Sequence, residues 1–376
     1  MSSTRPIRER NPATTAVVGV LGGGQLGRML ALAGHPLGVE LVCVDPSADA
    51  PAAAVARHVT RDYADPEALA ALASCAVVTY EFESVPVSAA EALAEKTRVS
   101  PPPEALRVAQ DRLLEKQCFR ALGIPTPDFA AVGSRAELEA GCEALGFPAV
   151  LKTRRLGYDG KGQRVLRSRK ELDDAWTALG GVPCILERFV PFERELSLLV
   201  VRGQDGSTVH YPLVENEHEG GILRVTRAPA PGLTPSLQAR AAEYGSRLCA
   251  RLAYVGVLAL ELFEAGGELL ANEMAPRVHN SGHFTIEGAR TSQFENHLRA
   301  ILGLPLGSPE VPEPCAMLNC VGALPDPHAV LSVPGAHLHL YGKAPRAGRK
   351  VGHITVTGEQ ALAERLERLR ALPGVG

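Results

Sequence analysis

The chain has 376 residues, of which 45% are apolar and 22% charged, and its formal net charge is −3. This length is enough for two or three domains, and the composition is that of an ordinary globular protein. The small net charge gives no overall basic field that would attract nucleic acid. The sequence contains no run of about 18 apolar residues, so no membrane span is expected. The polar N-terminus has no apolar signal core, so residues 1–15 are expected to form a disordered leader.

Eight cysteines are spread along the chain without a C-x-x-C pair. Most lie inside apolar stretches, which predicts reduced thiols packed as small core residues in a cytoplasmic protein. Cys315 and Cys320 form the only close pair, and a metal role for them is not expected because no further ligand stands nearby.

Strands and helical segments alternate in the first hundred residues. Apolar runs predict strands at Ala16–Leu21, Glu40–Asp45 and Ala76–Tyr80, and a glycine loop and a helical pattern follow the first of them. This alternation is typical of βαβ units with a parallel sheet. A run of three prolines, 101–103, ends the pattern, and a domain boundary is expected near it.

The first glycine loop, Gly22–Gly27, has G-x-G-x-x-G spacing between a strand and a helix. Asp45 ends the next strand at about the distance suited to a ribose hydroxyl, so the spacing alone favours a dinucleotide site. The same loop could bind the phosphate of another substrate at the helix N-terminus. Glu81 and Glu83 follow a further strand, at the edge where parallel sheets bind ligands. A tight turn without a ligand is the alternative for both segments.

Beyond the prolines the sequence predicts a helix over Glu104–Leu122 and two strands, Ala149–Lys152 and Ile185–Val190, flanking a second glycine loop. The second of these strands is expected at a sheet edge. The tail after Pro305 is expected to be β-rich. The remaining elements follow in chain order. We expect two antiparallel strands at Leu196–Arg202 and Thr208–Pro212, an amphipathic helix at Pro235–Tyr254 and a hairpin of Val257–Phe263 with Glu268–Glu273. A helical region at Phe284–Ile301 and three short strands at Ala316–Val321, His337–Tyr341 and His353–Val356 complete the pattern.

The second glycine loop, Gly157–Gln163, indicates polyphosphate chemistry. Lys152 ends the strand before the loop and can reach an α- or β-phosphate, while the glycines can fold over the phosphates and exclude water. Lys161 adds a donor, and Tyr158 and Asp159 lie at the tip, where a second substrate could meet them. A surface hairpin without a ligand is the alternative.

Two glutamates, Glu261 and Glu273, are expected on facing strands of one hairpin, with Asn272 beside the second. Converging carboxylates repel each other unless a cation lies between them, and Mg²⁺ commonly takes one or two carboxylates plus phosphate oxygens. Exposed strand glutamates are the alternative. His279 and His283 have the spacing of a zinc pair on a helix, but the Gly and Ser between them favour a loop and polar contacts to a substrate.

Six ordered motifs resemble those of the N5-carboxyaminoimidazole ribonucleotide synthetase family of the ATP-grasp superfamily. They are GGGQLGRM (22–29), TYEFE (79–83), QDRLLEKQ (110–117), GYDGKGQ (157–163), NEMAPRVHNSGH (272–283) and GRKVGH (348–353). The resemblance spans about residues 16–357, and the fourth and fifth motifs are the most specific. One departure is Lys161, where arginine is common, so the charge is kept but bidentate geometry is not.

The resemblance implies an α/β and α+β protein with three domains. These are a Rossmann-like domain (16–108), an ATP-grasp domain (109–305, with a lid subdomain at about 124–190) and a small β-rich C-terminal domain (306–376). It implies a cytoplasmic homodimeric ligase that uses ATP and bicarbonate to carboxylate 5-aminoimidazole ribonucleotide through carboxyphosphate, giving ADP and phosphate in purine biosynthesis. The product would pass to a separate mutase, and no nucleic acid or membrane partner is implied.

The resemblance also implies roles for individual residues. Mg²⁺, with Mn²⁺ as a possible substitute, would bind Glu261 and Glu273. The catalytic set would be Tyr158, Asp159, Lys161, Arg277 and Lys350, with Asp159 handling the amine proton. The substrate set would be Gly24, Gln25, Leu26, Glu81, Glu83, Tyr158, Arg277, Asn280, Ser281, Lys343, Arg349 and Lys350. The ATP set would be Arg112, Lys152, Gly157, Tyr158, Asp159, Gly160, Lys161, Gly162, Gln163, Glu187, Arg188, Phe189, Val190, Glu195, His218, Asn272 and Glu273.

Three other functions remain open from the sequence. Another ATP-grasp carboxylase or ligase, such as biotin carboxylase or the formate-using glycinamide ribonucleotide transformylase, would share the lysine and the glutamates. A nicotinamide oxidoreductase built on Gly22–Gly27 would leave Lys152, Glu261 and Glu273 without a role. A nucleotide-binding subunit without catalytic activity would keep the same motifs. The basic cluster of Lys343, Arg346, Arg349 and Lys350 is either a solvated surface or a clamp on an anionic substrate.

Overall fold

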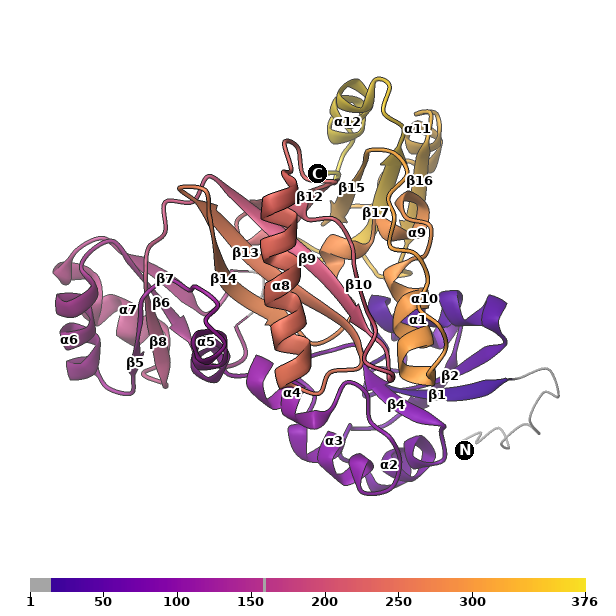
Figure 1. The fold of residues 1–376 in the computed structure, drawn as a ribbon, viewed down its shortest axis with the longest axis horizontal. Coiled ribbons are helices and arrows are strands. Elements are labelled where there is room, and N and C mark those ends of the chain that lie inside the picture. The colour runs from indigo at the N-terminus through magenta and orange to yellow at the C-terminus, as the bar shows by residue number, and fades with distance from the viewer. Residues whose placement is uncertain (1–14, 158–159) are drawn as a thin grey trace. The chain divides into compact units, whose positions relative to one another are not determined.

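The computed structural model describes residues 15–157 and 160–376 (Figure 1). The expected leader therefore lies almost wholly outside the described residues, as do Tyr158 and Asp159. The chain divides into two compact units, Met1–Ser100 and Pro101–Gly376.

The first unit contains a four-stranded sheet in the order β3-β2-β1-β4, and all its strands are parallel. The predicted βαβ pattern is confirmed, but the sequence did not indicate β3, whose short run RHVT is partly exposed and carries two basic side chains. The elements of this unit are β1 (Ala16–Leu21), α1 (Gln25–Gly34), η1 (His35–Leu37), β2 (Val39–Asp45), η2 (Pro51–Ala54), β3 (Arg57–Thr60), α2 (Pro66–Ala73), β4 (Val77–Tyr80) and α3 (Val87–Ala94).

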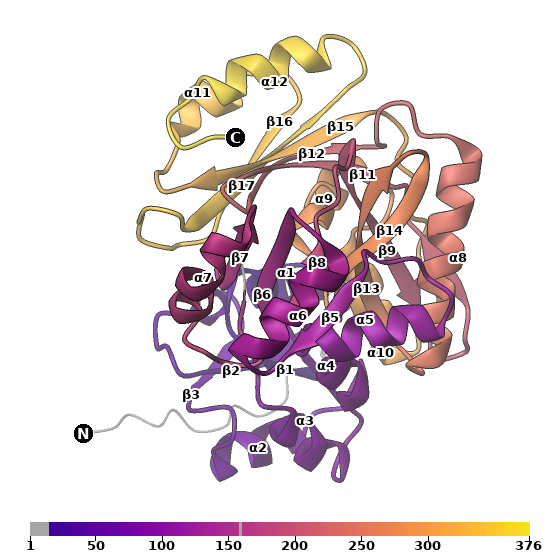
Figure 2. The same ribbon diagram turned by 90° about the vertical axis from the view of Figure 1, so that its left-hand side faces the viewer.

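The second unit begins with two helices and a small antiparallel sheet in the order β5-β8-β6-β7. Helices α6 and α7 pack side by side on this sheet (Figure 2). The expectation that the strand at residue 185 lies at an edge is wrong. Four of the five residues of β8 are buried, and the strand lies between β5 and β6. The elements are α4 (Pro103–Ala109), α5 (Arg112–Ala121), β5 (Phe129–Val132), α6 (Arg135–Leu145), β6 (Ala149–Thr153), β7 (Gln163–Leu166), η3 (Arg169–Glu171), α7 (Leu172–Ala178) and β8 (Cys184–Arg188).

The helix expected over Glu104–Leu122 is divided into α4 and α5. Asp111 interrupts it because its backbone is extended and its carboxylate accepts a hydrogen bond from the N–H of Leu113 at 3.1 Å. An aspartate in this role begins a new helix and does not continue the old one. Ser292 likewise separates α9 from α10 in the second helical region.

A nine-stranded antiparallel sheet forms the rest of the second unit. Its order is β14-β13-β9-β11-β12-β15-β17-β16, and β10 pairs with β9. The strands of the C-terminal tail thus extend the same sheet beyond β12, and two helices accompany them. The elements are β9 (Arg194–Arg202), β10 (Thr208–His210), β11 (Val214–Glu219), β12 (Ile222–Ala228), α8 (Pro235–Arg251), β13 (Gly256–Ala265), β14 (Glu268–Ala275), η4 (Asn280–Gly282), α9 (Thr285–Gly288), α10 (Gln293–Leu302), β15 (Cys315–Val321), α11 (Pro327–Leu331), β16 (Ala336–Leu340), β17 (Lys350–Thr357) and α12 (Leu362–Arg370).

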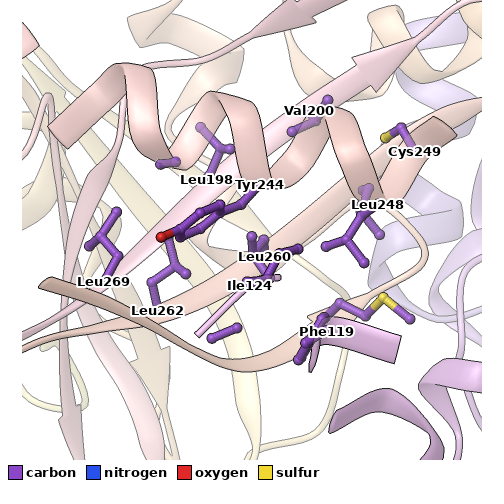
Figure 3. Packing of buried hydrophobic residues seen from close by; sticks show 14 of the residues in the cluster. Phe119, Ile124, Leu198, Val200, Tyr244, Leu248, Cys249, Leu260, Leu262 and Leu269 are labelled. Carbon is purple, nitrogen blue, oxygen red and sulfur yellow. The ribbon is translucent and has the colours of Figure 1, made fainter. Parts of the chain in front are cut away.

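The main apolar core lies between this sheet and helices α5 and α8. Leu198 of β9 and Leu260 of β13 point towards α8, where Tyr244 and Leu248 meet them (Figure 3). Phe119 of α5 belongs to the same cluster and is fully buried. Burial of one such side chain contributes about 1.5–3 kcal/mol, so the cluster fixes α5 firmly beside β13 and β14.

Seven of the eight cysteines are buried and the eighth is partly buried, and all are free thiols. The prediction that the cysteines pack as small core residues is confirmed. In residues 15–157 and 160–376 no helix is long and apolar enough to cross a membrane.

Candidate active site

Helix α5 directs three charged side chains towards the edge strand β14. Arg112, Glu115 and Lys116 have i, i+3 and i+4 spacing and therefore share a helix face. Arg112 Nη1 donates to Glu273 Oε2 at 2.6 Å, Lys116 Nζ donates to the carbonyl of Ala271 at 3.0 Å, and Glu115 accepts from the backbone N–H of residue 274 at 2.6 Å. The helix thus holds both side chains and backbone of β14.

A β-bulge shapes the hairpin of β13 and β14. Glu261 lies directly opposite Glu273, but the next pair joins Leu262 to Ala271, so Asn272 has no partner of its own on β13. Bulges of this kind are common beside active sites, where they redirect a side chain. Here the Asn272 Oδ1 accepts from Lys152 Nζ at 3.4 Å. The bulge therefore places an amide and a carboxylate of consecutive residues at one site.

Paired carboxylates with nearby amide oxygen suit a hard divalent cation. Glu261 and Glu273 lie opposite each other on β13 and β14 and would be the carboxylates offered to such an ion. Within residues 15–157 and 160–376 no group of three or more His, Cys, Asp or Glu side chains has metal-site geometry. Two carboxylates, completed by phosphate oxygens, are the usual protein contribution to a Mg²⁺–nucleotide site. His279 Nε2 lies 3.1 Å from Glu261 Oε1, which keeps that carboxylate oriented.

Lys152 and Lys116 share the carboxylate of Glu187. Lys152 Nζ donates to Glu187 Oε2 at 2.8 Å, and Lys116 Nζ lies 3.5 Å from Oε1. All three residues are buried. Burial opposes the ionisation of Glu187, but the two lysines outweigh it and lower its pKa to about 2. Burial also lowers the pKa of Lys116, while Glu187 opposes that change.

The two acidic groups beside Arg112 differ in their protonation. Burial raises the pKa of Glu115, and the nearby charge of Glu273 raises it further, to about 8. Burial also acts on Glu273, but Arg112 and Lys152 outweigh it and lower its pKa to about 2. At neutral pH the carboxylate that faces Glu261 is therefore the ionised one.

The second glycine loop connects β6 to β7 and is fastened at its base. Thr153 N donates to the carbonyl of Gly162 at 2.8 Å, and Arg154 donates through Nε and Nη2 to both oxygens of Asp111 at 2.9 and 2.6 Å. Gly162 has φ +73°, and an added Cβ would lie 2.7 Å from the Thr153 hydroxyl, so only glycine fits there. Gly160 approaches the backbone of the β11–β12 turn, and Gln163 begins β7.

Residues expected on the adenine and ribose side are held by local contacts. The N–H groups of Arg188 and Phe189 donate to the carbonyls of Asp128 and Pro148 at 2.8 and 3.2 Å. His218 Nδ1 contacts Glu195 Oε2. Burial opposes protonation of His218, but Glu195 outweighs it and raises the histidine pKa.

The motif after β14 folds into a turn with a short 3₁₀ helix, so the loop predicted between His279 and His283 is confirmed. Ser281 Oγ lies 2.8 Å from His279 Nδ1, and Asn280 exchanges hydrogen bonds with Asn319 of β15 at 3.0 and 2.9 Å. Arg277 Nη1 donates to the carbonyl of residue 278 at 3.0 Å. His283 is fully buried, which removes it from any surface metal pair.

The C-terminal basic residues approach this region through Lys350 at the start of β17. Burial lowers the pKa of His283, and the charges of His279 and Lys350 lower it further. Arg349 donates through Nη1 to the carbonyl of Ala344 at 3.2 Å. Lys350 begins β17, which pairs with β15, and β15 carries the Asn319 that contacts Asn280.

In the first unit, two carboxylates occupy the glycine loop. Gly23 N donates to Asp45 Oδ2 at 2.9 Å, and Gly24 N donates to Glu81 Oε1 at 2.9 Å. Gly27 N also points to Glu81, at 3.4 Å from Oε2. The N–H groups expected to meet a phosphate therefore already have anionic partners. Of the other substrate-set residues in this unit, Gln25 and Leu26 begin α1 and Glu83 follows β4.

Three residues of this network were absent from the sequence predictions: Asp111, Glu115 and Lys116. All belong to the motif QDRLLEKQ, from which only Arg112 received a role. The helical spacing of Arg112, Glu115 and Lys116 could have indicated that they share a face.

The chain is similar to known proteins along nearly its whole length. Family models match along the chain: the ribonucleotide synthetase preATP-grasp domain at residues 15–110, the ATP-grasp domain at 117–294 and the phosphoribosylaminoimidazole carboxylase C-terminal domain at 315–368. N5-carboxyaminoimidazole ribonucleotide synthase of Pseudomonas aeruginosa is 55% identical over 94% of this chain and 99% of its own. The chain belongs to the N5-carboxyaminoimidazole ribonucleotide synthase family.

Solved structures of this family have the same fold. That of the Thermus thermophilus synthetase has a TM-score of 0.91 and 56% identity, covering 95% of this chain and 98% of its own. That of the Aspergillus clavatus synthase, in complex with ADP and 5-aminoimidazole ribonucleotide, has a TM-score of 0.88 and 36% identity, covering 95% and 97%. The predicted family, three-part fold class and assignment as an ATP-grasp ligase of the N5-carboxyaminoimidazole ribonucleotide synthase type are confirmed.

Proposed function

We propose that this chain carboxylates 5-aminoimidazole ribonucleotide on its exocyclic amine, consuming ATP and bicarbonate and releasing ADP and phosphate. The observation that carries the proposal is the convergence of Arg112, Lys152 and Asn272 with the Glu261–Glu273 pair, from four separate segments. Cations that already lie beside metal-type carboxylates are the arrangement that phosphoryl transfer requires. The family assignment supplies the identity of the acceptor.

The chemistry requires activation of bicarbonate. Bicarbonate is a poor electrophile because it is anionic and lacks a good leaving group. Attack of a bicarbonate oxygen on the γ-phosphorus breaks the bond to ADP and forms carboxyphosphate. The amine then attacks carboxyphosphate, or CO₂ released from it, and phosphate leaves. Water must be kept out because it would destroy the activated species.

The residues of the second unit divide this work. Arg112 and Lys152 would neutralise charge on the phosphates during transfer, and the loop Gly157–Gln163 would cover them. Glu187 supports Lys152 in this role through the 2.8 Å ion pair. We assign Glu195 and His218 to the ribose side of the nucleotide and residues 188–190 to the adenine side. Asp159 remains our candidate for the amine proton, with Tyr158 and Lys161 positioning the acceptor.

Mg²⁺, for which Mn²⁺ could substitute, would be held by Glu261 and Glu273. When bound, the ion supplies positive charge to the phosphate oxygens that gain negative charge in the transition state. The ionised state of Glu273 suits this role, since its pKa is lowered to about 2.

The other members of the substrate and catalytic sets keep their proposed roles. We assign anion recognition and orientation of the aminoimidazole nucleotide to Arg277, Lys350, Lys343 and Arg349, with Asn280 and Ser281 in support. In the first unit we assign substrate contact to Gly24, Gln25, Leu26, Glu81 and Glu83. The same proposal places the domain boundaries at residues 108 and 305. It also includes a homodimer, a cytoplasmic location and transfer of the product to a separate mutase.

ADP release tests this function. Purified protein is mixed with Mg²⁺–ATP and bicarbonate, with and without 5-aminoimidazole ribonucleotide, and ADP and the carboxylated product are measured. We expect ADP release to rise on addition of the nucleotide and to match product formation. ADP release that responds to biotin or glycinamide ribonucleotide, but not to the aminoimidazole nucleotide, would reject the proposal, as would turnover of NAD.

A further inference from the structure

The free edge of strand β14 is bonded by side chains of α5 and by one backbone carbonyl, and not by another strand. It is the outermost strand of its sheet, and edge strands leave backbone N–H and C=O groups without ladder partners. At the bulge, the N–H of Ala271 donates to the carbonyl of Pro125 at 2.7 Å, and its carbonyl accepts from Lys116 Nζ at 3.0 Å. The N–H of Met274 donates to Glu115 Oε1 at 2.6 Å. These contacts bracket Asn272 and Glu273.

Neither of the two α5 side chains can itself meet a ligand from solvent. Glu115 is 2% exposed and Lys116 is fully buried. Burying an ionisable group costs several kcal/mol unless it is well paired, so two such groups on one helix turn need a compensating gain. Their partners are the backbone that flanks Asn272 and Glu273 and, for Lys116, the carboxylate that holds Lys152.

We propose that Glu115 and Lys116 are positioning residues for Mg²⁺–ATP: together they hold the bulge of β14 that presents Asn272 and Glu273, and Lys116 also fixes Glu187, which in turn orients Lys152. The inference deepens the proposed function and rests on the nucleotide roles assigned to Glu273 and Lys152. Both residues act through others and touch no reacting atom.

Three ionisable residues of α5, Arg112, Glu115 and Lys116, occur within five positions and all contact β14. Arg112 contacts the side chain of Glu273, while Glu115 and Lys116 contact the backbone on either side of it. A displacement of about 1 Å at a reacting group can lower a rate by about 10²-fold. Loss of the Glu115 and Lys116 contacts should therefore affect nucleotide binding and turnover more than it affects binding of the second substrate.

Substitutions on α5 test the proposal. Glu115→Leu removes the acceptor for the N–H of Met274, whereas Glu115→Gln keeps an acceptor oxygen. Lys116→Met removes both contacts of the lysine. Phe119→Leu is the matched control, because Phe119 lies on the same helix, is fully buried and belongs to the apolar core and not to the polar network. For each variant we would measure the unfolding temperature, the KM for ATP, the KM for 5-aminoimidazole ribonucleotide and the Kd of Mg²⁺–ADP by calorimetry.

We expect Glu115→Leu and Lys116→Met to raise the KM for ATP and the Kd of Mg²⁺–ADP by about tenfold or more, which corresponds to about 1.4 kcal/mol. The KM for the aminoimidazole nucleotide should stay within about twofold, and Glu115→Gln should stay within about threefold of wild type for ATP. Phe119→Leu should lower the unfolding temperature without the change in nucleotide affinity.

Nucleotide affinities within about twofold of wild type in Glu115→Leu and Lys116→Met would overturn the proposal. An equal loss of affinity in Phe119→Leu would do the same, because it would show a general effect of destabilising α5. Should either polar variant not fold, Lys116→Gln carries the test, since it can still donate to Ala271 but offers no charge to Glu187; an unchanged Kd then overturns the Glu187 arm. Because the Kd of Mg²⁺–ADP is measured without the second substrate, failure of this inference is distinct from failure of the proposed carboxylation.

Discussion

The two glycine loops of this protein are both rich in glycine but have different charged residues around them. In the first unit, the loop at residues 22–27 donates its N–H groups to the carboxylates of Asp45 and Glu81. In the second unit, the loop at residues 157–163 is fastened by Arg154 and follows Lys152, which lies beside Asn272. A glycine pattern therefore indicates a tight backbone turn, and the charges gathered around the turn decide which ligand it suits. The comparison explains why the first loop has dinucleotide spacing in a protein of an ATP-grasp family.

The largest expected effect is at the carboxylate of the second unit. Glu273→Gln replaces the carboxylate opposite Glu261 by a neutral amide. It should lower ATP turnover by about 10³-fold, because the amide binds the metal ion that assists phosphoryl transfer more weakly. ADP release at saturating Mg²⁺ measures the effect. Glu268→Gln on the same strand is the control, since Glu268 is exposed and forms an ion pair with Arg240, and it should stay near wild type. Near-normal turnover in Glu273→Gln would remove the metal assignment.

A smaller effect is expected at the second glycine loop itself. Gly162→Ala places a Cβ 2.7 Å from the Thr153 hydroxyl at φ +73°, so the base of the loop must shift. We expect kcat/KM for ATP to fall by about tenfold or more. Gly180→Ala is the matched control, because Gly180 has a similar φ of +76° but no heavy atom within 4 Å of the added Cβ. Equal losses in both variants would show that backbone strain alone is responsible.

A substitution beside the first loop should change the KM for a different substrate. Glu81→Gln removes a negative charge from the N-terminus of α1, where such a charge contributes about 0.3–1 kcal/mol. We expect a lower unfolding temperature and a higher KM for 5-aminoimidazole ribonucleotide, with the KM for ATP unchanged. Glu95→Gln on an exposed position of the same unit is the control. A change in the KM for ATP of the same size would contradict the division between the two loops.

The smallest effect concerns pH and His218. The histidine pKa is raised above its ordinary 6.5 by Glu195, against the effect of burial, so the protonated form stabilises the folded state. That contribution is fully present below pH 6.5 and is lost as the pH rises through the higher folded-state pKa. The difference in free energy of unfolding between wild type and His218→Gln should therefore decrease as the pH is raised from 6 to 9. A His328→Gln control, at an exposed site, should show no such trend; a constant or growing difference for His218→Gln would reject the assignment.

Much of the architecture followed from apolar periodicity. The strand Ala16–Leu21 and the hairpin around residues 265–267 form as predicted because each has a clear apolar pattern bounded by glycine. Where the prediction failed, tertiary contacts decided. Asp111 caps a new helix in the middle of a helical pattern, and the strand at Glu187 became central because its polar residue is neutralised by two lysines distant in sequence.

The site was predictable to a similar extent. Motif resemblance named the residues that the structure brings together, such as Lys152, Asn272 and Glu273. It did not indicate a role for the buried residues Glu115 and Lys116, because their partners are backbone groups beside the bulge of β14. Periodicity and composition give no register, and a bulge is a departure of a single residue from the register.

The most direct measurement is a crystal structure of the full chain with Mn²⁺ and a nonhydrolysable ATP analogue, using anomalous scattering to place the metal. We expect a manganese peak bound by both Glu261 and Glu273, with Arg112 and Lys152 contacting the phosphates. A metal bound elsewhere, or phosphates that bind away from these four side chains, would contradict it.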